Sequence, residues 1–258
     1  MYRLAALLII FVSLASIANS KQIIIAGDNW CPVNCQQDSS EQGFMIDVAK
    51  AALALSGYEL KYVEMPWLRA IQLAREGKIH GIVGAFIDDA PDFYYPSISF
   101  LKMSPNSLFA KKEFDWQYEN LRSLNAVRLG AVKGYDYGNL LNTYIKSINE
   151  SESKSLVQLS GNNAVARNIE FLMRGRIDVY VDAGPVFWYQ AKKMNIADEV
   201  KFVGSISPLE PCYIAFSPTH TDSKSLILAL DKGVTSLTQS NQVAEIAVKY
   251  GIPKKNYQ

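Results

Sequence analysis

Charged and aromatic residues suited to holding a small charged solute occur in four short segments, each directly after a stretch of apolar residues. The segments are 28–30, 84–88, 133–138 and 182–184. In an open parallel sheet, ligands bind beyond the carboxyl ends of the strands, where loops and helix N-termini expose backbone N–H groups. If the apolar stretches are strands, the four segments form one ligand site.

Two residues of opposite charge would give such a site its strongest interactions. Asp182 follows the apolar stretch 177–181. A carboxylate there is costly to bury unless it contacts a ligand or caps the helix that Pro185 opens. Arg69 lies near the start of another expected helix, where a guanidinium can hold a carboxylate through two parallel hydrogen bonds or simply face solvent. The residue types leave both alternatives open at each position.

The spacing of apolar residues predicts helices that alternate with strands. Phe44, Val48, Ala52 and Leu55 recur at helical spacing, and Gly57 stops the run. Because single helices separate the strands, the strands pair in parallel rather than as hairpins, and two such series predict two α/β lobes. Strands are expected at 22–26, 60–64, 79–83, 127–132, 155–159, 177–181 and 201–203, and helices at 44–55, 67–76, 139–148, 162–174, 185–194, 223–237 and 242–250.

The first series also carries a family pattern. The segments GFMIDVAKAAL (43–53) and REGKIHGIVG (75–84), with Trp67 after a strand, resemble the first lobe of bacterial extracytoplasmic solute-binding proteins of family 3. The resemblance covers nearly the whole chain after residue 20. It implies an α/β fold of the type II periplasmic binding protein class, in which two mostly parallel sheets flanked by helices enclose a ligand cleft. Two strands cross between the lobes, so lobe 1 is expected at 21–110 and 213–258, and lobe 2 at 111–212.

The resemblance also implies roles for individual residues. Trp30 matches the first-lobe aromatic residue that stacks on the ligand, and Asp182 matches the second-lobe aspartate that receives a ligand amino group. Segment 133–137 aligns with the turn that holds a ligand carboxylate, although Gly-Tyr-Asp replaces the usual Gly-Thr-Thr. The expected ligand-binding residues are Trp30, Trp67, Arg69, Ala85, Phe86, Lys133, Gly134, Tyr135, Asp136, Tyr137 and Asp182.

One segment departs from the pattern of amino-acid receptors. In those receptors an arginine in the segment matching 84–91 pairs with the α-carboxylate of the ligand. Here the segment carries Asp88 and Asp89 and no arginine. Either Arg69 replaces the missing arginine, or the ligand is not a conventional α-amino acid, and the sequence leaves both possibilities open.

The N-terminus has the composition of an export signal. Arg3 precedes the apolar stretch 4–17, and residues 18–20 have the small-x-small form of a cleavage site. We therefore expect a signal peptide cleaved after Ser20 and a soluble periplasmic product, with a retained anchor as the alternative.

The cysteines fit an oxidising compartment. Cys31 and Cys35 are expected to form a local disulfide, with a metal site as the alternative, and Cys212 to be a free, buried thiol. His80 and His220 show no ligand spacing to each other or to the cysteines, so neither a metal site nor a cofactor is expected.

Composition narrows the class of function. Lysine plus arginine number 26 and aspartate plus glutamate 25, so loss of Arg3 with the signal peptide leaves a neutral chain that would not attract nucleic acid. We expect a monomer that captures a small polar, amino-acid-like solute for an ABC transporter permease or a sensor. The alternative is an enzyme of this fold resembling cyclohexadienyl dehydratase. The acids available to it, Glu64, Asp88 and Asp89, form no evident catalytic pair, and we expect no enzyme.

Overall fold

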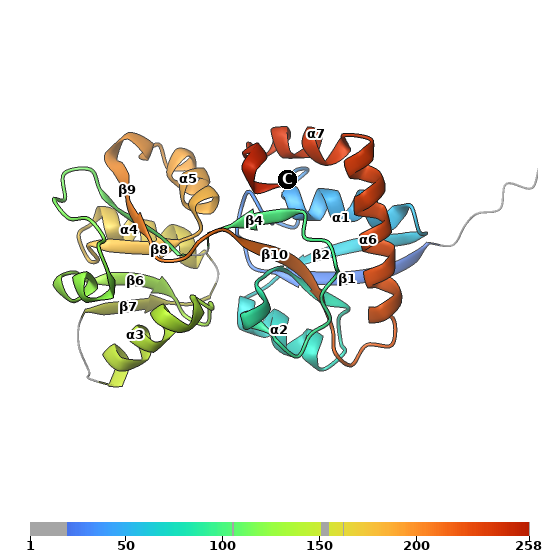
Figure 1. Cartoon of the computed structure of the whole chain (residues 1–258), viewed down its shortest axis with the longest axis horizontal. Coiled ribbons are helices and arrows are strands. Elements are labelled where there is room, and N and C mark those ends of the chain that lie inside the picture. The colour runs from blue at the N-terminus through green and yellow to red at the C-terminus, as the bar shows by residue number, and fades with distance from the viewer. Residues whose placement is uncertain (1–19, 105, 151–154, 162, 258) are drawn as a thin grey trace, which may run out of the picture.

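The protein folds into two lobes, each built on a five-stranded sheet with helices on either side (Figure 1). The computed structural model describes residues 20–104, 106–150, 155–161 and 163–257. Within these residues no helix is both long and apolar enough to cross a membrane. The predicted signal peptide lies outside them, apart from Ser20.

The first lobe contains the sheet order β2-β1-β3-β10-β4. Strands β1, β2 and β3 pair in parallel, and β10 runs antiparallel to both β3 and β4. Helix α1 connects β1 to β2 and helix α2 connects β2 to β3, which is the predicted alternation. The elements are β1 Lys21–Gly27, α1 Phe44–Ala54, β2 Tyr58–Glu64, α2 Trp67–Arg75, β3 Gly81–Ala85, β4 Leu101–Met103, β10 Glu210–Phe216, α6 Ser223–Gln239 and α7 Gln242–Lys249.

The second lobe repeats this plan with the sheet order β7-β6-β8-β5-β9. Strands β6, β7 and β8 pair in parallel, and β5 lies antiparallel between β8 and β9. The elements are β5 Ser107–Lys111, β6 Leu129–Val132, α3 Gly138–Glu150, β7 Leu156–Leu159, α4 Ala164–Met173, β8 Val179–Asp182, α5 Gly184–Lys193 and β9 Val200–Ser205.

The chain passes between the lobes twice, between β4 and β5 and again at 206–209 between β9 and β10, and these two connections are called the hinge here. The first crossing comes before β5, a few residues earlier than the boundary expected at 110, because β5 pairs with β8 and β9 of the second sheet. The second comes before β10, which already pairs within the first sheet. A short apolar strand carries no local signal for which of two sheets it joins. After β10 the chain stays with the first lobe, where α6 and α7 pack against α1.

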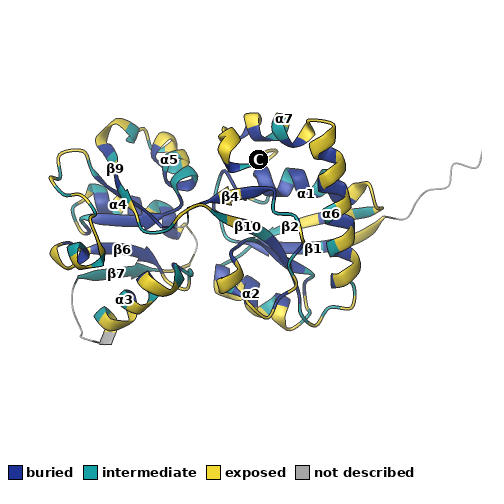
Figure 2. Cartoon of the chain, in the orientation of Figure 1, coloured by how far each residue is buried: buried dark blue, intermediate teal, exposed yellow. Residues whose placement is uncertain are grey.

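The apolar face of α1 shows how the helical spacing becomes core. Phe44, Val48 and Ala52 are fully buried, whereas Leu55 lies just past the end of the helix and is 62% exposed, contrary to the inward position that the spacing suggested. Helix α6 comes so close that a Cβ on Gly233 would lie 2.3 Å from the backbone oxygen of Ala52. Figure 2 likewise shows the central strands β6 and β8 dark, the edge strand β7 intermediate, and the outer helix faces exposed.

The cysteine pattern is confirmed. Cys31 and Cys35 form a disulfide in the loop after β1, with their Cα atoms 4.4 Å apart. Cys212 is a free, buried cysteine.

Candidate ligand-binding cleft

A small cavity lies between the lobes, at the carboxyl ends of β1 and β3 in the first lobe and of β6 and β8 in the second. Parallel strands bring the loops after them to the same edge of a sheet, so the fold itself gathers these residues. Its volume is about 30 Å³, which holds little more than a water molecule. The lining residues are Asp28, Trp30, Trp67, Val83, Gly84, Phe86, Asp89, Tyr135, Asp136, Tyr137 and Asp182.

Asp182 ends β8 and is the most deeply buried acid of the cavity. Its Oδ1 atom accepts hydrogen bonds from Nε1 of Trp30 at 3.0 Å and from the backbone N–H of Ala183 at 2.7 Å, and its Oδ2 atom accepts one from the Tyr180 hydroxyl. Only 1% of Asp182 is exposed. Burial raises the pKa of Asp182 to about 6, although the bonds from Tyr180 and Trp30 pull in the opposite direction.

Asp28 makes a second bond across the cleft. The Tyr135 hydroxyl of the second lobe donates a hydrogen bond to Oδ2 of Asp28 at 2.5 Å. Burial raises the pKa of Asp28 to about 6 against the lowering effect of this bond, and the negative charge of Asp182 raises it further. The Tyr135 ring also meets the Trp30 ring edge-on, with 6.3 Å between centroids.

Asp89 makes the third bond across the cleft. Its Oδ2 atom accepts from the backbone N–H of Phe86 at 2.8 Å, which holds the carboxyl at the start of the short 3-10 turn Ile87–Asp89. Its Oδ1 atom accepts from the backbone N–H of Asp136 in the second lobe at 3.2 Å. Burial raises the pKa of Asp89 to about 7. Among the described residues, these three hydrogen bonds across the cleft all have a carboxyl group as the acceptor.

The sequence comparison identifies the family. The pattern of bacterial extracellular solute-binding proteins, family 3, matches residues 23–253. The chain belongs to this family. No curated protein matches the sequence.

Solved structures share the fold of this solute-binding protein at low sequence identity. A substrate-binding protein of an ABC uptake transporter from Streptococcus pneumoniae, with bound histidine, superposes with a TM-score of 0.75 at 18% identity, covering 93% of this chain and 96% of that one. An amino acid ABC transporter substrate-binding protein from the same species, bound to L-arginine, gives 0.68 at 22% identity, over 92% and 98%. A histidine kinase sensor domain similar to periplasmic binding proteins gives 0.70 at 15% identity, over 90% and 96%.

Most, but not all, of the residues expected from the sequence line this cavity. Trp30, Trp67, Phe86, Tyr135, Asp136, Tyr137 and Asp182 do so. Arg69 does not: it lies exposed on α2, and Lys133 is exposed as well. Ala85 is buried within β3, and Gly134 instead approaches the Leu68 side chain of the opposite lobe.

Two lining acids were not in the set expected from the sequence. Asp28 lies in the segment expected after the first strand, and Asp89 directly follows the segment expected after the third. The strand-end rule therefore includes Asp28 and stops one residue short of Asp89. Val83 and Gly84 complete the first-lobe wall.

The turn that would hold a ligand carboxylate in amino-acid receptors is braced internally here. Asp136 Oδ1 accepts hydrogen bonds from the backbone N–H of Gly138 at 2.5 Å and from Nδ2 of Asn142 at 2.9 Å. The Tyr137 hydroxyl accepts from the backbone N–H of Val132 at 2.7 Å. These bonds fix the direction of both side chains before any ligand binds.

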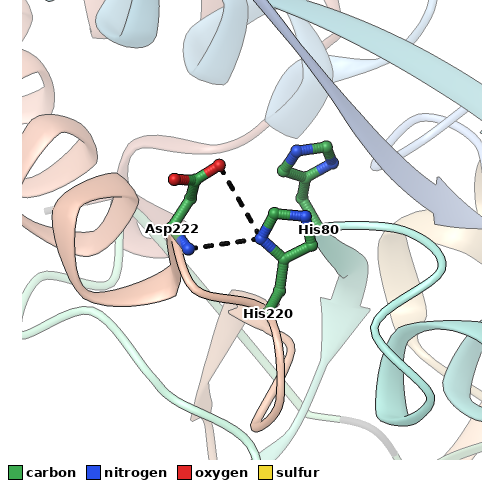
Figure 3. Close-up of side chains that lie close together, drawn as sticks. All are labelled: His80, His220 and Asp222. Carbon is green, nitrogen blue, oxygen red and sulfur yellow. Dashed lines mark hydrogen bonds and ion pairs between the residues drawn. The ribbon is translucent and has the colours of Figure 1, made fainter.

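The two histidines, which show no ligand spacing in the sequence, lie next to each other in the first lobe (Figure 3). His80 directly precedes β3, so the pair lies at the end of that strand opposite the cleft. Their ring centroids are 4.1 Å apart. Nδ1 of His80 accepts from the backbone N–H of Ile24 at 3.0 Å, and Nδ1 of His220 accepts from that of Asp222 at 3.2 Å. A neutral imidazole that accepts at Nδ1 carries its proton on Nε2, so neither ring has a lone pair left for a metal ion.

The Asp222 carboxylate near this histidine pair is already matched by a cation. Its Oδ2 atom lies 2.6 Å from Nζ of Lys21. The cluster of His80, His220 and Asp222 is therefore satisfied by its own hydrogen bonds and by Lys21, and it fastens β1 and the start of α6 to the start of β3.

Proposed function

We propose that this solute-binding protein captures a small solute carrying a protonated nitrogen, enclosed between its lobes in the periplasm. The relatives with bound histidine and L-arginine support an amino-acid-like solute. The observation that carries the proposal is the pairing of Asp182 with Trp30 across the cavity. A buried carboxyl beside an aromatic ring offers an ammonium group both an ion pair and a cation–π contact.

Closure of the cleft around the solute would report that the site is occupied. The three hydrogen bonds across the cleft all end on carboxyl groups. The N–H groups of a bound cation can therefore replace the donors of Trp30, Tyr135 and the Asp136 backbone. A closed lobe arrangement then presents a distinct surface to a membrane partner. The relatives support an ABC transporter permease or a sensor as that partner. We assign the protein itself a monomeric state.

A panel of amines, amino acids and neutral polar solutes, screened by thermal unfolding, tests this function. A solute that binds the folded protein raises the midpoint in proportion to its occupancy. We expect stabilisation by solutes with a protonated nitrogen and none by neutral sugars. The same solutes should leave Asp182→Asn nearly unshifted, and mass spectrometry should recover the solute unchanged after incubation, as expected of a binding protein rather than an enzyme. Stabilisation by neutral solutes alone would refute the proposal.

A further inference from the structure

The cleft continues in a second cavity beside the hinge. This cavity measures about 130 Å³ and is lined by Phe86, Ile87, Asp88, Asp136, Gly138, Glu210 and Pro211. Phe86 and Asp136 line both cavities. The two spaces are therefore neighbours between the lobes, and the line from one to the other past Phe86 and Asp136 is called the path here.

The charges along this path have one sign. Its acids are Asp28, Asp88, Asp89, Asp136, Asp182 and Glu210, and no lysine, arginine or histidine occurs among the described residues that line the two cavities. The whole chain has a formal net charge of +1, so the acids are concentrated here and do not reflect an acidic protein. Burial, followed by the charges of Asp88 and Asp136, also raises the pKa of Glu210.

The walls between the acids are aromatic. The Trp30 ring meets both Phe86 and Tyr135 edge-on, with 6.3 Å between centroids in each case. Aromatic faces attract cations and also pack against methylene groups. Since the first cavity measures only about 30 Å³, a slender chain suits the path better than a bulky head group.

We propose that the cleft binds a linear aliphatic diamine or polyamine. One ammonium group would pair with Asp28 and Asp182, the methylene chain would lie against Phe86, and a second ammonium group would reach Asp136 and Glu210. This inference rests on the proposed function and names its ligand class. An α-carboxylate has no partner along the path, because Arg69 lies exposed on α2 and outside both cavities.

Two probes that differ in a single group test the inference. L-Lysine and 1,5-diaminopentane have the same chain and the same two amines, and only lysine has the α-carboxylate. Calorimetric titration of the full exported chain should give binding of 1,5-diaminopentane about 100-fold tighter than that of lysine, since a buried carboxylate without a partner opposes binding. Affinity for the diamine should also rise between pH 5.5 and 7.5, with protons released on binding, because the buried acids must ionise to pair with it.

A second comparison isolates the far ammonium group. Glu210→Gln should weaken binding of 1,5-diaminopentane about 10-fold while leaving that of 1-aminopentane unchanged, because only the diamine reaches the second cavity. Glu113→Gln removes the same charge from an exposed acid whose partner is Lys111, and it should affect neither ligand.

The outcomes separate this inference from the proposed function. Lysine binding as tightly as the diamine, with both dependent on Asp182, would overturn the diamine assignment and leave the proposed function standing. Binding of calcium ions in place of every amine would overturn both. Equal losses for 1-aminopentane and 1,5-diaminopentane in Glu210→Gln would show that the second cavity does not take an ammonium group and would likewise overturn the assignment.

Discussion

Trp30 of the first lobe donates its indole N–H to Oδ1 of Asp182 in the second lobe, over 3.0 Å. The two residues lie 152 positions apart in the chain, so the bond exists only when the lobes are closed. It supplies the buried carboxyl with a donor in the closed lobe arrangement. An ammonium group that pairs with Asp182 would compete with Trp30 for this acceptor.

Replacing the indole by a plain ring tests this bond. Trp30→Phe keeps an aromatic side chain but removes the N–H donor, so the free energy of unfolding without ligand should fall by about 1–2 kcal/mol. Urea unfolding measures the change. In the double variant with Asp182→Ala, which removes the acceptor, the two losses should fall short of additivity by about 1 kcal/mol, because they remove the same bond. Strict additivity would mean that the bond contributes nothing.

The stability of the unliganded protein should depend on pH through the cleft acids. The folded pKa of Asp182 is about 6, above its usual value of 3.8, so between these values the folded state holds a proton that the unfolded state releases. The stability that Asp182 adds by holding this proton is fully present below pH 3.8 and is lost as the pH rises through 6. From pH 4.5 to 7.5 the loss is about 2 kcal/mol, at about 1.4 kcal/mol per pKa unit. Asp182→Asn should lack this loss of stability between pH 4.5 and 7.5. If urea unfolding gave the wild type and the variant the same dependence on pH, the result would contradict this account.

Closure also requires a glycine at the contact between lobes. A Cβ on Gly134, whose φ is +92°, would lie 2.7 Å from the Leu68 side chain of the opposite lobe. We expect Gly134→Ala to weaken ligand binding about 10-fold by calorimetry, with partial recovery in the double variant with Leu68→Ala. The matched control is Gly175→Ala, which has a φ of +63° but open space around its Cβ. Equal effects of the two alanine variants would assign the loss to backbone strain instead.

His80 should make the stability depend on pH with the opposite sign. Burial, followed by the neighbouring His220, lowers the folded pKa of His80, while Asp222 acts against this and Lys21 adds to it. The unfolded state therefore takes up a proton first as the pH falls through about 6.5, and stability drops below that value. His80→Asn keeps an acceptor for the Ile24 N–H and cannot titrate. Urea unfolding should show that the free energy of unfolding falls less between pH 7.5 and 5.5 for the variant than for the wild type. An equal fall would contradict this role of His80.

Local patterns in the sequence were sufficient for the alternation of elements. The spacing of Phe44, Val48 and Ala52 and the stop at Gly57 predict α1 because helix formation there depends on neighbours within a few positions. The same holds for the strands, whose ends gave the segments that line the cleft. Local patterns do not determine whether Arg69 faces the cleft or solvent, because the first turn of a helix offers positions of both kinds.

Long-range contacts account for what the sequence left open. Asp28 meets Tyr135 only after both lobes have folded. His80 meets His220 only after the early and late segments of the first lobe have come together. Whether Arg69 replaces the missing arginine, or the ligand is not a conventional α-amino acid, also depends on long-range structure. The exposed position of Arg69 and the six acids along the cleft favour the unconventional ligand.

Calorimetric titration of three proteins with 1,5-diaminopentane tests the central claim most directly. The wild type should bind one ligand per chain, Asp182→Asn should bind about 2–5 kcal/mol more weakly, and Arg69→Gln should bind like the wild type. The first loss follows from removing a buried charge that pairs with the ligand, and the second variant changes a residue outside the cleft. Loss of binding in Arg69→Gln with full binding in Asp182→Asn would contradict the account, because the protein would then recognise a carboxylate.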